Sequence, residues 1–291
     1  MPDADDATLD PTLLRRIAET ALEEDGWRDD VTTRALVPPA QRGVGLITAK
    51  AEGVIAGLPV AAAVFALLDS EIRFSADAPE GTTVSPGDVL ARAEGALAPI
   101  LTGERVALNL LQRLSGIASA TRKLVEAVAG LDVIILDTRK TTPGLRELER
   151  YAVRVGGGTN HRFNLSDGVL IKDNHLAAAR DRELSIGQVI EEARRSAPDG
   201  MPIEIEVTSA EAAREALDGG ADVILLDNMA PAEMRAVVVL VGGRALTEAS
   251  GGVTLENVRA VAETGVDRIS VGALTHSSPA LDISLEIEAR G

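Results

Sequence analysis

From about residue 132 onward, short apolar segments alternate with amphipathic stretches of helical periodicity, and this alternation constrains the fold most strongly. The apolar segments are 132–137, 168–172, 202–207, 222–227, 244–249 and 267–272. Short strands that are apolar on both faces and joined by helices are typical of a parallel sheet. Six such strands in succession favour an α/β barrel, with an open doubly wound sheet as the alternative.

The first third of the chain mixes helical and strand-like patterns. Residues 13–22 carry apolar side chains at helical spacing up to Gly26, and strand-like pieces follow at 45–50 and 54–56. An apolar helix is expected over 60–68, and a long helix is expected to begin with Thr102 as its N-cap. These patterns predict a mixed α and β region that precedes the barrel.

A turn-rich segment at 79–95 is similar in pattern to part of a biotinyl or lipoyl carrier domain. Such carriers need a lysine on a hairpin, and this segment has none. We therefore expect a structural β-turn segment here, and a non-catalytic carrier or binding module is the disfavoured alternative.

Composition excludes several classes of function. The net charge of −16 and an aromatic content of 2% argue against a nucleic-acid partner, because a polyanion would be repelled and would find few stacking surfaces. The absence of cysteine excludes disulfides, thiolate nucleophiles and cysteine-ligated metals. No signal-peptide pattern is found, and the longest apolar stretch, 57–68, is too short for a membrane span. We expect a cytoplasmic protein without a membrane partner.

Polar side chains stand at the carboxyl ends of the expected strands, where barrel enzymes place their active sites. Two of the four lysines, Lys140 and Lys172, lie at such ends, and arginines are frequent between residues 137 and 175. On so acidic a chain, this cationic region indicates a small anionic substrate that Arg139 and Arg162 could clamp. Three other arginines are interpreted as an exposed helix face paired with Glu147 and Glu149, namely Arg146, Arg150 and Arg154.

Two glycine-bearing turns after the last strands, 250–252 and 271–273, could cradle a phosphate with backbone N–H groups. Glu206 and Asp227 end the third and fourth strands. Opposite a cationic pocket they could bind a sugar diol or a phosphate-bound Mg²⁺, or pair with Lys140 and Lys172. The residues alone leave these roles open.

The run from Leu136 to His175 resembles the signature segment of the quinolinate phosphoribosyltransferases. Its parts are DTRKTTPG, GGGTNHR and LIKDNH, and further matches cover nearly the whole chain: 24–33, 101–119, 203–207, 225–228, 248–252 and 267–277. A small departure is Thr247, where family members often carry an apolar residue.

The resemblance implies an α/β protein of two domains. An N-terminal α/β sandwich-like domain, 1–112, would be joined by the C-terminal segment 276–291, and an incomplete α/β barrel with parallel strands would span 113–275. The resemblance also implies a homodimer in which the partner completes each site, and Arg105 matches the arginine that such enzymes deliver across the interface. From the residues alone, Arg105 would be read as a surface charge.

The implied reaction joins quinolinate to 5-phosphoribosyl 1-pyrophosphate with decarboxylation, and yields nicotinate mononucleotide for NAD biosynthesis. The resemblance assigns Lys140 to the pyrophosphate or the transferring centre, and Glu206 and Asp227 to the ribose and Mg²⁺. The substrate-binding residues would be Arg105, Thr138, Arg139, His161, Arg162, Lys172, Ser250, Gly251, Ser270 and Gly272. His161 is expected to be a carboxylate ligand rather than a proton shuttle, and His175 and His276 are expected to be structural.

Two enzymatic alternatives remain at this stage. A phosphoribosyltransferase that uses nicotinate without decarboxylation would need to hold one carboxylate, whereas this region offers cations enough for two. A Schiff-base aldolase would be built on Lys140 or Lys172.

Overall fold

The computed structural model describes residues 9–289 of the chain, which divides into two compact units. The N-terminal unit comprises the chain up to Arg122, Thr141–Gly157 and the chain from Leu274 onward. The barrel unit comprises Lys123–Lys140 and Gly158–Ala273. The chain therefore passes between the two units several times, and each unit is built from segments distant in sequence.

The N-terminal unit contains a four-stranded sheet in the order β12-β1-β5-β3. Its strands are β1 (Arg42–Ala49), β3 (Arg73–Ala76), β5 (Val89–Ala96) and β12 (Ile283–Ala289), and each neighbouring pair is antiparallel. Two short strands, β2 (Gly53–Val54) and β4 (Thr83–Val84), form a separate pair. The C-terminal strand β12 thus belongs to the first unit.

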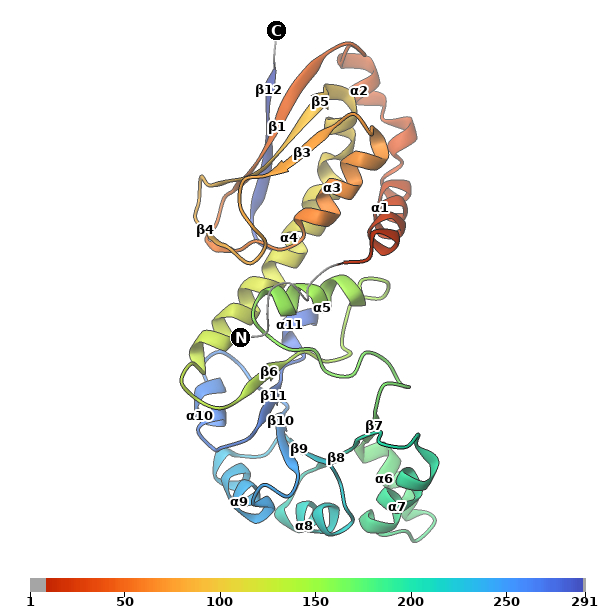
Figure 1. Cartoon of the computed structure of the whole chain (residues 1–291), viewed down its shortest axis with the longest axis vertical. Coiled ribbons are helices and arrows are strands. Elements are labelled where there is room, and N and C mark those ends of the chain that lie inside the picture. Colours follow the sequence, from red (N-terminus) through yellow and green to blue (C-terminus); the bar gives the residue numbers. More distant parts are fainter. Residues whose placement is uncertain (1–8, 290–291) are drawn as a thin grey trace. The chain divides into compact units, whose positions relative to one another are not determined.

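Most other elements of this unit are helices (Figure 1). They are α1 (Pro11–Asp25), α2 (Val31–Leu36), α3 (Leu58–Leu68), α4 (Leu97–Ala127) and α5 (Arg146–Val155), with a 3-10 turn, η2 (Trp27–Asp29). Of these, α3 and the first half of α4 lie against the sheet. Helix α1 starts where the Asp10 carboxylate accepts from Thr12 N at 2.9 Å, and it ends at Gly26, which has φ 68°. The short apolar segment predicted at 60–68 is α3.

The N-cap prediction at Thr102 is wrong, because α4 begins at Leu97 directly after β5. Leu97 and Ile100 are buried, so the apolar face of the helix extends backward to the end of the strand. The Thr102 hydroxyl instead donates to Asp30 Oδ2 at 2.9 Å, and it connects α4 to the start of α2.

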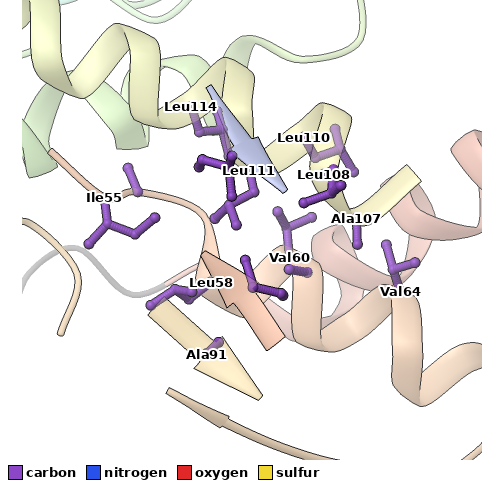
Figure 2. Close-up of a cluster of buried hydrophobic side chains, with 14 of the residues drawn as sticks. Ile55, Leu58, Val60, Val64, Ala91, Ala107, Leu108, Leu110, Leu111 and Leu114 are labelled. Atoms are coloured by element: carbon purple, nitrogen blue, oxygen red, sulfur yellow. The ribbon is translucent and has the colours of Figure 1, made fainter. Parts of the chain in front are cut away.

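The core of the N-terminal unit lies between α3, α4 and the antiparallel sheet. Figure 2 shows Val60 and Val64 of α3 together with Leu108 and Leu111 of α4, and Ala91 of β5 completes the layer. These side chains are aliphatic and close to fully buried, which agrees with a chain poor in aromatic residues.

The barrel unit contains six strands that match the six apolar segments predicted from the sequence. They are β6 (Ile134–Leu136), β7 (Val169–Ile171), β8 (Ile203–Val207), β9 (Val223–Asp227), β10 (Leu246–Ser250) and β11 (Arg268–Ser270). Its helices are α6 (Asp173–Arg180), α7 (Ile186–Ser196), α8 (Ala210–Asp218), α9 (Pro231–Val241) and α10 (Val258–Ala262). The short helix α11 (Ala273–His276) follows β11 and belongs to the N-terminal unit from Leu274 onward.

The strand order is β6-β11-β10-β9-β8-β7, and every neighbouring pair is parallel. From β7 to β11 each strand lies beside the next one in sequence, and β6 closes onto β11. This is the circular order of a barrel, interrupted between β6 and β7, which are the two sheet edges. A doubly wound sheet would reverse direction at a switch point, so that alternative is excluded.

Thr247 departs from the family pattern, and the structure accounts for this residue. Its side chain is buried on β10, and both its backbone N and its hydroxyl donate to Asp267 Oδ2 at 2.7 Å. The buried hydroxyl is therefore satisfied.

None of the helices between residues 9 and 289 combines the length and apolarity needed to cross a bilayer.

Candidate active site

Strand register gathers the acidic residues of the barrel unit on one face of its sheet. Glu204 is paired with Val223 and Glu206 with Leu225, which is also paired with Glu248. Paired residues point to the same side of a sheet, as do residues two apart along a strand. Glu204, Glu206, Asp227 and Glu248 therefore share a face. The residues of opposite parity are apolar and buried on the other face: Ile205, Ile224, Leu226, Ala249 and Ile269.

The same register brings the hydroxyl residues and a lysine to this face. Ser250 is paired with Asp227 on one side and with Ser270 on the other. Lys172 lies two residues beyond Leu170, which is paired with Glu204. All of these residues stand at or near the carboxyl ends of their strands, where the sequence placed the candidate site.

Lys172 and Glu206 form an ion pair between β7 and β8. Lys172 Nζ lies 2.8 Å from Glu206 Oε2, and the two side chains are 47% and 12% exposed. The mostly buried carboxylate therefore has a cation beside it, while the lysine still faces solvent.

Asp137 anchors the segment that returns to β6 after residue 158. Its side chain is fully buried at the end of β6, and it accepts from Asn160 Nδ2 at 2.6 Å and from His161 N at 2.7 Å. Thr159 forms an isolated parallel bridge with Leu136. These contacts satisfy the buried carboxylate and set the start of the segment that carries His161 and Arg162.

His161 faces two buried carboxylates across the sheet. Its Nε2 lies 3.2 Å from Glu204 Oε2 and 3.4 Å from Glu248 Oε1. Burial opposes a charge on this imidazole, but the hydrogen bonds and charges of Glu204 and Glu248 raise the pKa of His161 above its ordinary value. On the other side of the ring, Nδ1 accepts from Arg162 N at 2.8 Å.

Arg162 and Arg139 form the cationic part of the site. Arg162 Nη1 donates to Gly168 O at 2.9 Å, which fixes the side chain against the start of β7. Burial lowers the pKa of Arg162, and the charge of Arg139 lowers it further. The two arginines thus contribute like charges to one region, which favours a bound anion there.

Asp227 is oriented by the residue that follows it. Asn228 Nδ2 donates to Asp227 Oδ2 at 3.0 Å, and Asn228 N donates to Ser250 O at 2.9 Å. Asn228 has φ 53°, a left-handed conformation that asparagine tolerates better than most residues. Gly251 has φ 88°, and a Cβ there would lie 2.3 Å from Asn228 Oδ1, so this position requires glycine.

The remaining predicted site residues fall in three places. Lys140 is exposed after β6, and its backbone N donates to Thr138 Oγ1 at 3.2 Å. Ser270 is buried at the end of β11, and Gly272 follows it closely. Arg105 lies in the N-terminal unit, on α4, where its side chain is exposed.

Sequence reasoning did not single out Glu248 and gave Glu204 no role. The sequence could have indicated both, because Glu204 lies two residues before Glu206 on β8 and Glu248 lies two residues before Ser250 on β10. Residues two apart on a strand point to the same face. The exposed helix face expected for Arg146, Arg150 and Arg154 is not found, because all three side chains are half-buried. Glu149 is fully buried and forms its ion pair with Arg113, at 2.9 Å from Arg113 Nη2.

Comparisons with known proteins agree with this architecture. Residues 30–115 match the family model described as the quinolinate phosphoribosyl transferase N-terminal domain, and residues 117–286 match its C-terminal domain. A probable nicotinate-nucleotide pyrophosphorylase [carboxylating] of Bacillus subtilis is 44% identical over 274 residues, which cover 94% of this chain and 93% of that protein. A mitochondrial quinolinate phosphoribosyltransferase [decarboxylating] of Nicotiana tabacum is 39% identical, over 94% of this chain and 82% of its own.

Solved structures show the same fold. NadC from Streptococcus pyogenes superimposes with a TM-score of 0.92 at 40% identity, and the match covers 98% of this chain and 99% of that one. A nicotinate-nucleotide pyrophosphorylase from Ehrlichia chaffeensis gives a TM-score of 0.88 at 39% identity, over 94% of this chain and 98% of that one. Both halves of the sequence, the strand order and the motifs at the strand ends thus agree, and the chain belongs to the quinolinate phosphoribosyltransferase family.

Proposed function

We propose that this chain transfers the phosphoribosyl group of 5-phosphoribosyl 1-pyrophosphate to quinolinate with loss of carbon dioxide, in the biosynthesis of NAD. The observation that carries the proposal is a cationic cluster at the strand ends of an otherwise acidic protein, within a chain that matches the family over both domains. Both substrates are anions, so such a cluster suits them.

Quinolinate would bind to the cations beside the open edge of the sheet. Its two carboxylates would be held by Arg139, Arg162 and Lys172, together with Thr138 and, as the resemblance implies, His161. The electrostatic effect of Arg139 on Arg162 supports this assignment, because two guanidinium groups whose charges act on each other suit a dianionic ligand. Lys172 would exchange part of its interaction with Glu206 for a substrate carboxylate.

The 5-phosphate would bind where β10 and β11 end. Ser250 and Ser270 are paired in register, and the turns at Gly251 and Gly272 follow them. The left-handed φ of Gly251 and Gly252, 88° and 60°, supports a loop whose N–H groups could converge on an anion.

Mg²⁺ would be held by Glu206 and Asp227 together with substrate phosphate oxygens. The residues fit this ion: two partly buried carboxylates lie on the same face of neighbouring strands, and oxygen is the ligand that Mg²⁺ prefers. When bound, the ion would neutralise charge on the pyrophosphate. Lys140, which is exposed after β6, would act on the same leaving group.

The chain's own residues then have two tasks in the reaction. In the first step the pyridine nitrogen forms a bond to the anomeric carbon while the bond from that carbon to pyrophosphate breaks. The cations hold the two reactants in line, and the carboxylates of Glu206 and Asp227 face the positive charge that develops on the ribose. In the second step the carboxylate next to the cationic ring nitrogen leaves as carbon dioxide, and the ring carbon takes a proton from solvent.

A homodimer would complete each site, with Arg105 supplied by the partner subunit. Arg105 is exposed on α4, and the neighbouring helix α2 carries Val31 and Leu36, each 75% exposed. The hydrogen bond from Thr102 to Asp30 ties this apolar surface to the first turns of α4. Large apolar side chains beside an exposed arginine support a subunit interface at this surface.

We further propose a cytoplasmic location and no nucleic-acid or membrane partner. The acidic charge and the low aromatic content support the absence of a nucleic-acid partner.

A product assay tests the proposed function. Purified protein would be given Mg²⁺, 5-phosphoribosyl 1-pyrophosphate, and either quinolinate or nicotinate. We expect nicotinate mononucleotide and stoichiometric carbon dioxide from quinolinate only. Product from nicotinate alone would move the chain to the non-decarboxylating class, and trapping of substrate on Lys140 or Lys172 by borohydride would indicate an aldolase.

A further inference from the structure

His161, Glu204 and Glu248 form a compact cluster inside the barrel unit. One ligand atom from each lies within 4.8 Å of the others, and Glu204 and Glu248 are 7% and 0% exposed. Within residues 9–289, the Glu248 carboxylate makes no hydrogen bond of good geometry, and its Oε1 lies 3.4 Å from His161 Nε2. Two buried acids beside one histidine could hold a divalent cation, or they could hold the histidine itself.

The proton positions on His161 decide between these two interpretations. A histidine that ligates a metal through Nε2 normally donates a hydrogen bond from Nδ1–H. Here Nδ1 does the opposite, because it accepts from Arg162 N at 2.8 Å. The ring proton must then be on Nε2, which faces Glu204 Oε2 at 3.2 Å and Glu248 Oε1 at 3.4 Å. Nε2–H is a donor and leaves no lone pair for a metal.

The same contacts argue against a doubly protonated ring. The two carboxylates favour a second proton on His161, but that proton would point at the N–H of Arg162. The contact between Nδ1 and Arg162 N is the shortest of the three. The neutral ring with its proton on Nε2 therefore fits the hydrogen bond from Arg162 N to Nδ1 and the contact of Nε2 with Glu204.

We propose that Glu204 and Glu248 are positioning residues that hold His161 as the Nε2–H tautomer, so that Nδ1 fixes the backbone of Arg162 in the site. Arg162 is then held at two points, through its backbone N by His161 and through Nη1 by Gly168 O at 2.9 Å. The role of this network in catalysis rests on the proposed function, in which the Arg162 guanidinium holds a quinolinate carboxylate. In this network both ring nitrogens of His161 are used within the protein, so His161 supports Arg162 and does not take the role that the resemblance implied, which was to bind the substrate carboxylate itself.

The tautomer can be measured directly, because the chain contains three histidines. Protein labelled with ¹⁵N-histidine would be studied by long-range ¹H–¹⁵N correlation at neutral pH, with His175→Ala and His276→Ala used for assignment. For His161 we expect the shift of an unprotonated nitrogen at Nδ1 and of a protonated one at Nε2. Two protonated nitrogens, or a proton on Nδ1 alone, would overturn the proposal.

Variants of the acids separate hydrogen bonding from charge. Glu204→Gln keeps an acceptor for Nε2–H, so we expect it to retain the tautomer, whereas Glu204→Leu should lose it. Glu248→Gln should retain it in the same way. Glu211→Gln, an exposed acid on α8, is the matched control and should leave the His161 signals unchanged. Melting temperatures of all variants would show which of them fold. An unchanged tautomer in a folded Glu204→Leu protein would contradict the proposal.

Two further readouts distinguish this role from a metal site and from a purely structural one. Added Mn²⁺ without substrates should not broaden the His161 signals, and selective broadening would establish a metal site instead. In the assay, Glu204→Leu should raise the KM for quinolinate about tenfold or more through displacement of Arg162, with a much smaller change in the KM for 5-phosphoribosyl 1-pyrophosphate. Equal changes in both constants would overturn the positioning role. If the protein made no product from quinolinate at all, the NMR result would still stand and only the proposed function would fail.

Discussion

At the scale of single residues, Gly251 and Asn228 depend on each other. Asn228 orients Asp227, and its side chain occupies the space that a Cβ on Gly251 would need, 2.3 Å from Asn228 Oδ1. We expect Gly251→Ala to move Asn228, and with it Asp227, and to raise the KM for 5-phosphoribosyl 1-pyrophosphate about tenfold or more. Steady-state kinetics on the purified variant would measure this change.

The adjacent glycine provides the control for that substitution. Gly252 also has a positive φ, 60°, but a Cβ there would meet Asn228 Oδ1 only at 3.9 Å. Gly252→Ala therefore carries backbone strain of about 1 kcal/mol without the clash. If both variants changed the KM equally, strain of the loop rather than contact with Asn228 would be the cause.

Glu149 is a second residue whose surroundings predict that its replacement strongly lowers the free energy of unfolding. Its side chain is fully buried and accepts from Arg113 Nη2 at 2.9 Å, from Thr142 N at 3.0 Å and from Thr142 Oγ1 at 2.7 Å. Glu149→Ala would leave Arg113 without its anionic partner, so we expect a loss of about 3–5 kcal/mol in the free energy of unfolding. Urea denaturation would measure it, with the exposed Glu147→Ala expected to stay within about 0.5 kcal/mol of the parent. A small loss for Glu149→Ala would show that Arg113 keeps its position through other contacts.

Residues that belong to contiguous motifs were predictable, whereas partners across strands were not. Lys172, Glu206 and Asp227 stand in recognisable runs at strand ends, and the structure places them on one face of the sheet. The contact between His161 and Glu248 depends on the register of β10 and on the path of the segment after residue 158. The sequence indicates which residues of a strand point to the same face, but it does not indicate which strands are neighbours or in what register. The contact with Glu248 was therefore missed.

At the scale of elements, α4 contains Gly116 at a point where the C-terminal segment packs so closely against the helix that no side chain fits. A Cβ on Gly116 would lie 2.0 Å from Pro279 O and 3.0 Å from Ala280 Cα, so the C-terminal segment crosses directly over this helix turn. We expect Gly116→Ala to push that segment away and to cost about 3 kcal/mol in the free energy of unfolding. Chemical denaturation and proteolysis of the segment before β12 would test this.

Gly103 in the same helix is the matched control. A Cβ there would meet the flexible end of Leu68 at 2.6 Å rather than backbone. Its helix-propensity gain of about 1 kcal/mol offsets the rearrangement of Leu68, so Gly103→Ala should be nearly neutral. Equal destabilisation by both substitutions would mean that α4 tolerates no added volume anywhere, and would remove the special role of the C-terminal crossing.

Elements with a strong apolar pattern were predicted well, and boundaries that depend on tertiary contacts were not. The six strands of the barrel unit lie within the six apolar segments or one residue beyond, because both faces of each strand are covered. The start of α4 was misplaced because Thr102 has the chemistry of an N-cap. Its hydroxyl is used instead for a contact with Asp30, which is distant in sequence.

At the scale of the whole molecule, the circular strand order explains how the segments between β6 and β7 can carry site residues. The sheet is open between these strands, and Asp137 at the end of β6 fixes the segment with His161 and Arg162. A closed barrel would have strand pairing at this edge. The open edge thus leaves the cationic residues of the proposed quinolinate subsite beside a sheet that is acidic on its inner face.

The dimer is the part of the proposal that only the whole molecule can test. Arg105→Ala and Arg139→Ala should each abolish activity, because each removes a cation from every site. In a mixture whose subunits exchange, half of the dimers are hybrids, and each hybrid has one site with both arginines intact. We therefore expect about one quarter of the parent activity to return. Mixing Arg139→Ala with Arg162→Ala is the matched control, since both residues would belong to the same subunit and every hybrid site would lack one of them. Mass spectrometry of differently tagged subunits would verify exchange. Equal recovery in both mixtures, or none in the first despite exchange, would place Arg105 outside a shared site.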